Sequence, residues 1–174
     1  MFISFEGVDY SGKTTQAELL LERLRKDGKK VLFLREPGGT ALSEKIRTIL
    51  LEKSRIQIAQ KTELFLFSAA RCQLVSEVVV KALEEGTVIV CDRFFDSPTA
   101  HQGYGRGLSL EEIRVVNRIA TSGTTPDLTI LVDIEVPEIR RRLVAAGLAA
   151  DRMESAGDQF YDRVRSGYLA MARA

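Results

Sequence analysis

The feature that most constrains this chain is the run GVDYSGKT at Gly7–Thr14, which fits the pattern G-x-x-x-x-G-K-[ST]. A short apolar run, Phe2–Phe5, comes directly before it. Directly after it, apolar residues recur at helical spacing from Ala17 to Leu24. The sequence therefore predicts a strand, a tight glycine turn and a helix, in the order that is typical of a phosphate-binding loop.

The residue types in this loop suit the binding of a nucleoside triphosphate. Glycines let backbone N–H groups turn toward the β- and γ-phosphates, and the helix N-terminus adds positive potential. Lys13 would bridge phosphate oxygens, and the Thr14 hydroxyl would ligate Mg²⁺, with Asp9 as a second candidate metal ligand. No Asn-Lys-x-Asp motif for reading guanine occurs in the sequence, so the expected donor is ATP. The predicted ATP contacts are Gly7, Val8, Asp9, Tyr10, Ser11, Gly12, Lys13, Thr14 and Thr15.

Short apolar runs and helical patterning alternate along the chain. The predicted strands are Phe2–Phe5, Val31–Leu34, Val88–Cys91 and Leu128–Asp133. Strands separated by helices imply a parallel sheet covered on both faces. The predicted fold is therefore α/β, a three-layer α/β/α P-loop NTPase, and 174 residues with 45% hydrophobic content suit a single domain over 1–174.

The helices between the strands carry recognisable end signals. The first is expected to end at Lys26–Gly28, and a second follows Gly38-Gly39. Lys61–Glu85 is long enough for one extended helix or two abutting ones, and Gly86 would terminate it. Ser109–Glu112 has the residue pattern of a capping box and predicts the start of a further helix.

The overall charge gives no reason to expect a nucleic-acid or membrane partner. Lys and Arg total 25 against 24 Asp and Glu, a net charge of +1. Apolar runs fall well short of the ~20 residues that cross a bilayer. Cys72 and Cys91 lack metal-type spacing, so we expect a reduced, cytoplasmic protein whose partners are small nucleotides.

Beyond the loop, five further segments together resemble the bacterial type of thymidylate kinase, in register from about Met1 to Ala174. They are Phe5–Gly7, Arg35–Thr40, Phe67–Arg71, Asp92–Phe94 and Gln102–Gly107. The resemblance implies transfer of the γ-phosphoryl group of ATP to dTMP, which gives dTDP. Another nucleoside monophosphate kinase, a nucleoside kinase and a P-loop ATPase switch are the alternatives. The resemblance and the long apolar helices also predict a homodimer.

A kinase that brings two anions together needs arginines beyond the loop lysine. Arg93 follows a predicted strand at its carboxyl end, where open α/β sheets bind ligands, and Asp92 beside it could orient Mg²⁺-bound water. By resemblance, Arg93 and either Arg35 or Arg47 contact or adjoin the acceptor phosphate. A solvated surface charge is the alternative for Arg47.

Phe67 and Arg71 lie four apart on a predicted helix, so a ring and a guanidinium share one face. The resemblance makes them the platform for thymine and makes Gln102 the residue that hydrogen-bonds the base. Core packing is the alternative for Phe67. Pro37 and Ser97 complete the predicted substrate contacts. Pro98 and His101 depart from the family pattern, in which a polar side chain and a tyrosine are usual.

The remaining predictions also come from the resemblance. Asp9 is similar to the carboxylate that contacts the acceptor's sugar, with a turn-forming role as the alternative. The Arg140–Arg142 run and Arg152 fall in a mobile, arginine-bearing lid at about 140–157. Tyr10 replaces a loop arginine of some relatives, so a lid arginine, with Arg152 as the predicted catalytic one, should act in transfer. The predicted catalytic set is Lys13, Asp9, Arg93, Asp92 and Arg152. Relatives continue with another strand and helix, which this sequence is expected to lack.

Overall fold

The computed structural model describes residues 1–53, 56–147, 152–153 and 157–173. Within these residues four strands form one sheet, in the order β2-β3-β1-β4: β1 (Phe2–Glu6), β2 (Val31–Arg35), β3 (Val88–Asp92) and β4 (Leu128–Leu131). Every neighbouring pair is parallel. The predicted parallel sheet is confirmed, with β1, β2 and β3 each one residue longer than expected and β4 ending at Leu131.

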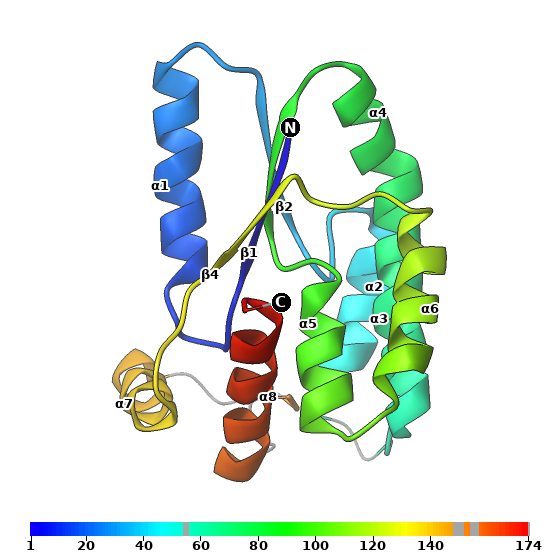
Figure 1. Ribbon diagram of the computed structural model, residues 1–174, viewed down its shortest axis with the longest axis vertical. Helices are drawn as coiled ribbons and strands as arrows, with labels where there is room; N and C mark the ends of the chain where they lie inside the picture. Colours follow the sequence, from blue (N-terminus) through cyan, green and yellow to red (C-terminus); the bar gives the residue numbers. More distant parts are fainter. Residues whose placement is uncertain (54–55, 148–151, 154–156, 174) are drawn as a thin grey trace.

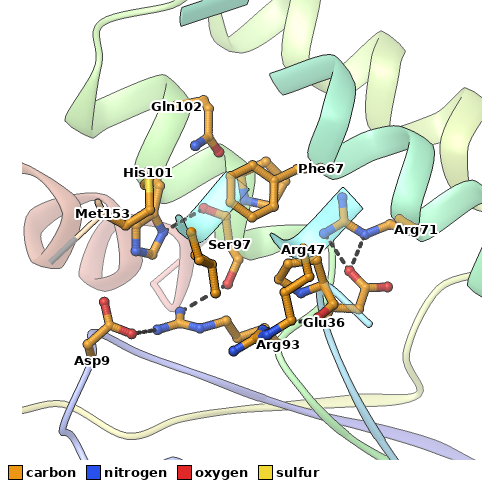
Figure 2. A pocket seen from close by; sticks show the side chains of 13 residues that line it. Asp9, Glu36, Arg47, Phe67, Arg71, Arg93, Ser97, His101, Gln102 and Met153 are labelled. Atoms are coloured by element: carbon orange, nitrogen blue, oxygen red, sulfur yellow. Dashed lines mark hydrogen bonds and ion pairs between the residues drawn. The ribbon is translucent and has the colours of Figure 1, made fainter. Parts of the chain in front are cut away.

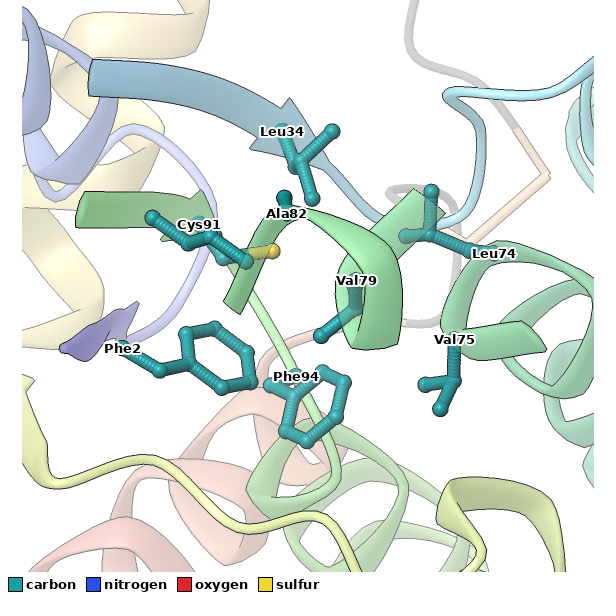
Figure 3. Close-up of a cluster of buried hydrophobic side chains, with 9 residues drawn as sticks. Phe2, Leu34, Leu74, Val75, Val79, Ala82, Cys91 and Phe94 are labelled. Atoms are coloured by element: carbon teal, nitrogen blue, oxygen red, sulfur yellow. The ribbon is translucent and has the colours of Figure 1, made fainter. Parts of the chain in front are cut away.

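Alternation of side chains along the strands builds the three layers. Phe2, Ile89 and Cys91 point to one face of the sheet, where they pack with the long helix of residues 60–84, and Figure 3 shows this cluster. Ile3, Phe5 and Val90 point to the other face and pack with α1 (Lys13–Lys26) (Figure 1). Because residues next to each other in a strand face opposite sides, both faces are apolar and both are covered by helices.

The predicted helix boundaries fall close to the observed ones. Helix α2 (Ala41–Leu51) begins after Thr40, whose hydroxyl accepts a hydrogen bond from the Ser43 N–H. Helix α6 (Leu110–Thr121) begins after Ser109, whose hydroxyl accepts from the Glu112 N–H. Both side chains satisfy a backbone donor that has no partner within its helix.

The long segment after α2 is one continuous helix that contains a π-helical turn. It comprises α3 (Gln60–Leu74), η1 (Val75–Val79) and α4 (Val80–Glu84), and the backbone is right-handed helical through each junction. A second π-helical turn, η2 (Thr99–Gly105), follows the short α5 (Asp96–Pro98). Such turns often occur at functional sites, and η2 carries His101 and Gln102.

Helices α7 (Val136–Ala146) and α8 (Asp158–Met171) follow β4. Figure 1 shows α8 beside η2, near the end of β1 from which the phosphate loop leaves. The predicted lid, 140–157, includes part of α7, Arg152, Met153 and Gly157, and its other residues above 147 lie outside the described part of the chain. In the described residues no helix is long and apolar enough to cross a membrane.

Candidate active site

The loop between β1 and α1 adopts a backbone that two of its glycines make possible. A Cβ atom on Gly7 would lie 2.3 Å from the Val132 carbonyl oxygen, just beyond β4. Gly12 has a φ of 95°, in the left-handed region, and starts α1. A side chain at either position would strain or displace the loop, so the glycines keep its backbone N–H groups close to the helix N-terminus.

Lys13 and Thr14 occupy the first turn of α1. The Lys13 ammonium lies 3.4 Å from the Val8 carbonyl oxygen and 3.9 Å from Asp9. The Thr14 hydroxyl donates a short hydrogen bond to one Asp92 oxygen, at the end of β3. The other Asp92 oxygen is buried and has no hydrogen-bond partner among the described residues.

Arg93 joins the phosphate loop to the segment after β3. Its guanidinium contacts Asp9 at 2.5 Å, the Gly7 carbonyl oxygen at 2.8 Å and the Tyr168 hydroxyl at 3.1 Å. Its backbone has a φ of 73°, which is uncommon for a residue with a side chain. This conformation costs free energy, and such residues cluster at functional sites.

The charges of this group are set by burial and by one another. Burial lowers the pKa of Lys13 to about 8, with the Arg93 charge acting in the same direction. Burial alone would raise the pKa of Asp9, but Arg93 and Lys13 hold it well below its usual value. Asp9 is therefore an anion and Arg93 a cation at neutral pH.

A pocket opens beside this ion pair, at the carboxyl ends of the strands (Figure 2). Eight of the predicted site residues line it: Asp9, Pro37, Arg47, Phe67, Arg71, Arg93, Ser97 and Gln102. Glu36, Leu51, Pro98, His101 and Met153 complete the lining. A second, more open pocket, the phosphate-loop pocket, is lined by Asp9, Tyr10 and Gly12–Thr15, so Asp9 borders both pockets.

Three arginines of this pocket are held in different ways. Arg47 donates a hydrogen bond to the Pro37 carbonyl oxygen at 3.0 Å. Arg71 is almost fully buried, and its Nε lies 2.6 Å from Glu36. Arg71 also donates to the Phe94 carbonyl oxygen at 3.0 Å, so much of its hydrogen-bonding capacity is used within the protein.

His101 is buried beside Ser97 and is uncharged. Its Nδ1 lies 2.9 Å from the Ser97 carbonyl oxygen, which can only accept, so Nδ1 carries the proton. Burial, with the nearby Arg93 charge second, lowers the pKa of His101 to about 4. A neutral ring of this kind presents an Nε2 lone pair and cannot donate from that atom.

Two predicted site residues lie away from the pocket floor. Arg35 is exposed and pairs with Glu44 at 3.2 Å, outside the pocket lining. The Arg152 guanidinium pairs with Glu63 at 2.6 Å and donates to the Leu50 carbonyl oxygen. Neither is brought to the phosphate loop in the structure.

Of the lid-region arginines, Arg142 reaches the phosphate loop. Its Nη1 donates to the Tyr10 carbonyl oxygen at 2.9 Å, and its Nε pairs with Glu138. Arg140 pairs with Asp158, and the exposed Arg141 pairs with Glu138. The sequence left open which of the three consecutive arginines faces the site, because each points in a different direction from the helix.

Helix α8 contributes residues that the sequence analysis missed. The Tyr168 hydroxyl lies 2.8 Å from Ser97 and 3.1 Å from Glu6, and the Tyr161 hydroxyl donates to Asp9 at 3.1 Å. The two tyrosines are seven residues apart and so lie on one helix face. Glu6 is buried at the end of β1. A carboxylate that ends an apolar strand needs polar partners once it is buried, so Glu6 was the sequence signal that could have predicted this network.

Comparisons with known proteins identify the family. Residues 5–174 match the family profile of thymidylate kinase. The chain is 49% identical to the thymidylate kinase of Pelotomaculum thermopropionicum, across 98% of this chain and 79% of the relative. It is 50% identical to the thymidylate kinase of Chlorobium luteolum, across 100% of this chain and 85% of the relative.

A solved structure agrees with this result. The crystal structure of thymidylate kinase from Ehrlichia chaffeensis superimposes with a TM-score of 0.80 at 34% identity. The superposition covers 99% of this chain and 86% of that one. A shared fold, a matching profile and close relatives thus point the same way, and this chain belongs to the thymidylate kinase family.

Proposed function

We propose that this chain transfers the γ-phosphoryl group of ATP to dTMP, which yields dTDP for the synthesis of dTTP. The observation that carries the proposal is the position of Asp9 and Arg93. Asp9 borders both the phosphate-loop pocket and the pocket lined by Phe67 and Arg71, and Arg93 contacts Asp9 at 2.5 Å. Donor and acceptor would therefore meet at this ion pair.

Different residues of the site would bind the two substrates. Lys13 and the loop backbone would hold the β- and γ-phosphates of ATP, and Arg142 lies over the same loop. Arg93 and Arg47 would neutralise the acceptor phosphate, and Phe67 would stack on the base. Holding two anions in line is most of what catalysis of phosphoryl transfer requires.

Thr14 and Asp92 have oxygens that fit Mg²⁺. One Asp92 oxygen accepts from Thr14, and the other is buried and without a partner in the described residues. Mg²⁺ prefers hydroxyl, carboxylate, phosphate and water oxygens. When bound with ATP, the ion would offset charge on the phosphates. Asp9, the other proposed ligand, engages Arg93 through Oδ1 and Tyr161 through Oδ2.

The arginines of the pocket beside the Asp9–Arg93 pair argue against a nucleoside acceptor. A nucleoside presents an uncharged hydroxyl, which needs no cations around it. Arg47, Arg71 and Arg93 all line the pocket, and Asp9 and Glu36 do not offset all three charges. A phosphorylated acceptor supplies the missing negative charge.

A coupled assay for ADP release, run with each nucleoside monophosphate in turn, tests the function. We expect dTMP to be the fastest acceptor. An apolar pocket gains only about 1–3 kcal/mol from one methyl group, so dUMP should be roughly 10- to 200-fold poorer. Release of ADP at the same rate without any acceptor would instead indicate an ATPase switch.

Cytosine and purine nucleotides should remain near background. Cytosine places an amino donor toward Arg71, and leaving two donors facing each other can cost ~10⁴-fold. Purines should exceed the space between Phe67 and the opposite wall. Equal initial rates for dTMP and dCMP at matched concentration would contradict this account of base reading.

We also infer that two copies of this chain associate through the outer face of α3 and α6. Phe65, Val115 and Ile119 are 57%, 44% and 68% exposed on this face. A contiguous set of large exposed apolar side chains is typical of an interface.

The proposed location is the cytoplasm. The free thiols of Cys72 and Cys91, and the need for ATP, fit this location.

A further inference from the structure

The amide of Gln102 has a fixed orientation at the base end of the pocket. Its nitrogen lies 2.9 Å from a carboxylate oxygen of Glu63, the first-turn residue of α3. A carboxylate only accepts hydrogen bonds, so Gln102 must donate its N–H there. The amide oxygen has no hydrogen bond to any residue that the structure describes, and Gln102 lines the pocket (Figure 2).

Glu63 is held in its charged form by its neighbours. It is almost fully buried and pairs with Arg106 at 3.3 Å and with Arg152 at 2.6 Å. Burial alone would raise the pKa of Glu63, but the hydrogen bond from Gln102 and the two arginine charges hold it below its usual value. At neutral pH Glu63 therefore has no proton to donate to Gln102.

We propose that Glu63 is a specificity-determining positioning residue: it fixes the Gln102 amide so that only the acceptor oxygen faces the base. Thymine and uracil carry a donor, N3–H, where cytosine carries an acceptor. An amide oxygen held toward N3 thus accepts a hydrogen bond from thymine or uracil and repels the N3 lone pair of cytosine. The inference rests on the proposed function, and it locates the choice of base in a residue that never contacts the nucleotide.

The substitution Glu63→Gln tests this directly. The amide oxygen of the new glutamine should stay with Arg152, which lies 2.6 Å from the Glu63 oxygen that Gln102 does not contact, so the NH₂ would face Gln102. Gln102 would then turn its oxygen toward that NH₂ and present its own NH₂ to the base. We expect the dTMP:dCMP ratio of kcat/KM to fall at least about tenfold, because an N–H now meets thymine N3–H. Glu85→Gln, which removes an exposed partner of Lys30, should leave the ratio unchanged.

A second variant keeps the test decisive if Glu63→Gln does not fold. Glu63→Asp keeps the negative charge that Arg106 and Arg152 pair with, but it shortens the side chain by one methylene and so withdraws the carboxylate from the Gln102 nitrogen. Without that partner the Gln102 amide can present either its oxygen or its NH₂ to the base, so the dTMP:dCMP ratio of kcat/KM should fall below the wild-type value.

Calorimetric binding of dTMP and dCMP reads the same ratio without turnover, which separates this inference from the proposed activity. A wild-type protein that shows no kinase activity but prefers dTMP in binding would refute the function alone. A folded Glu63→Gln or Glu63→Asp protein with the wild-type ratio would overturn the inference.

Discussion

At the scale of single residues, the site is a set of charges that burial makes mutually dependent. Arg93 holds Asp9, the Gly7 carbonyl oxygen and Tyr168 at once, in a backbone conformation that few side chains adopt. Lys13 lies within 3.9 Å of Asp9. Removing one member of such a group leaves the others uncompensated in a medium of low dielectric constant.

We expect Lys13→Ala and Arg93→Ala each to lower kcat by about 10²- to 10³-fold, because both act on charge that develops during transfer. Steady-state kinetics with dTMP and ATP measure the effect, and circular dichroism checks the fold. Arg23→Ala is the matched control, since Arg23 is exposed and pairs with Asp27 at 3.0 Å. Near-normal turnover in either site variant would refute its assignment.

Glu6 makes stability depend on pH. Burial, with the Asp96 charge second, raises the pKa of Glu6 from its ordinary value to about 7. The folded state thus binds this proton more tightly than the unfolded state. The stabilisation is complete below about pH 4.5 and is lost as pH rises through about 7, a change of roughly 3 kcal/mol.

The substitution Glu6→Gln, which is neutral throughout, should abolish this dependence. Urea unfolding at about pH 5 and pH 8 gives, for each protein, the change in the free energy of unfolding with pH. Subtracting the change of the variant from that of the wild type cancels the contribution of His101, which both proteins share. We expect only the wild type to lose stability through Glu6 as the pH rises. Identical slopes would show that Glu6 does not carry the proton.

At the scale of elements, α8 packs closely against η2 through two glycines. A Cβ atom on Gly105 would lie 2.5 Å from the Phe160 ring, and one on Gly167 would lie 2.6 Å from the Tyr104 ring. Tyr168 follows Gly167 directly and hydrogen-bonds Arg93. The close packing therefore sets where the helix holds an arginine of the active site.

Gly167→Ala should lower the melting temperature by a few degrees. Alanine favours a helix over glycine by about 1 kcal/mol, but overpacking against the Tyr104 ring costs about 1–3 kcal/mol, and the contact is at the rigid base of that ring. Turnover should fall as well, because Tyr168 shifts from Arg93. Ser166→Ala, exposed on the same helix, serves as the control, and a stabilised Gly167→Ala protein would contradict the packing argument.

At the scale of the whole molecule, the proposed interface lies on α3 and α6, away from the α1 side of the sheet (Figure 1). A charge buried in an apolar interface without a partner is costly. We expect Val115→Glu combined with Ile119→Glu to convert a dimer to a monomer in sedimentation at micromolar concentration. Leu19→Glu changes a residue of α1 whose exposure lies between those of Val115 and Ile119, and it should leave the dimer intact. A monomeric wild type would refute the proposal.

The sequence alone determined the parts of this protein that depend on local pattern. The glycine and lysine spacing of Gly7–Thr14, the apolar strands and the cap at Ser109 each act within a few residues, so their outcomes match the structure closely. The strand-end rule predicted Arg93 at the ligand-binding edge of the sheet, and the resemblance to thymidylate kinase supplied other residues that line the same pocket, such as Asp9 and Gln102.

Only the tertiary structure decided which partner each charged side chain takes. Arg142, not Arg152, meets the phosphate loop, because α7 turns that one arginine toward Tyr10 while Glu63 binds Arg152. The π-helical turn η2 aims Gln102 at Glu63, 39 residues away, and α8 brings Tyr168 to Glu6 across 162 residues. Periodicity shows which face of a helix is apolar, but a hydrogen bond across the fold depends on how the elements pack, which no local pattern encodes.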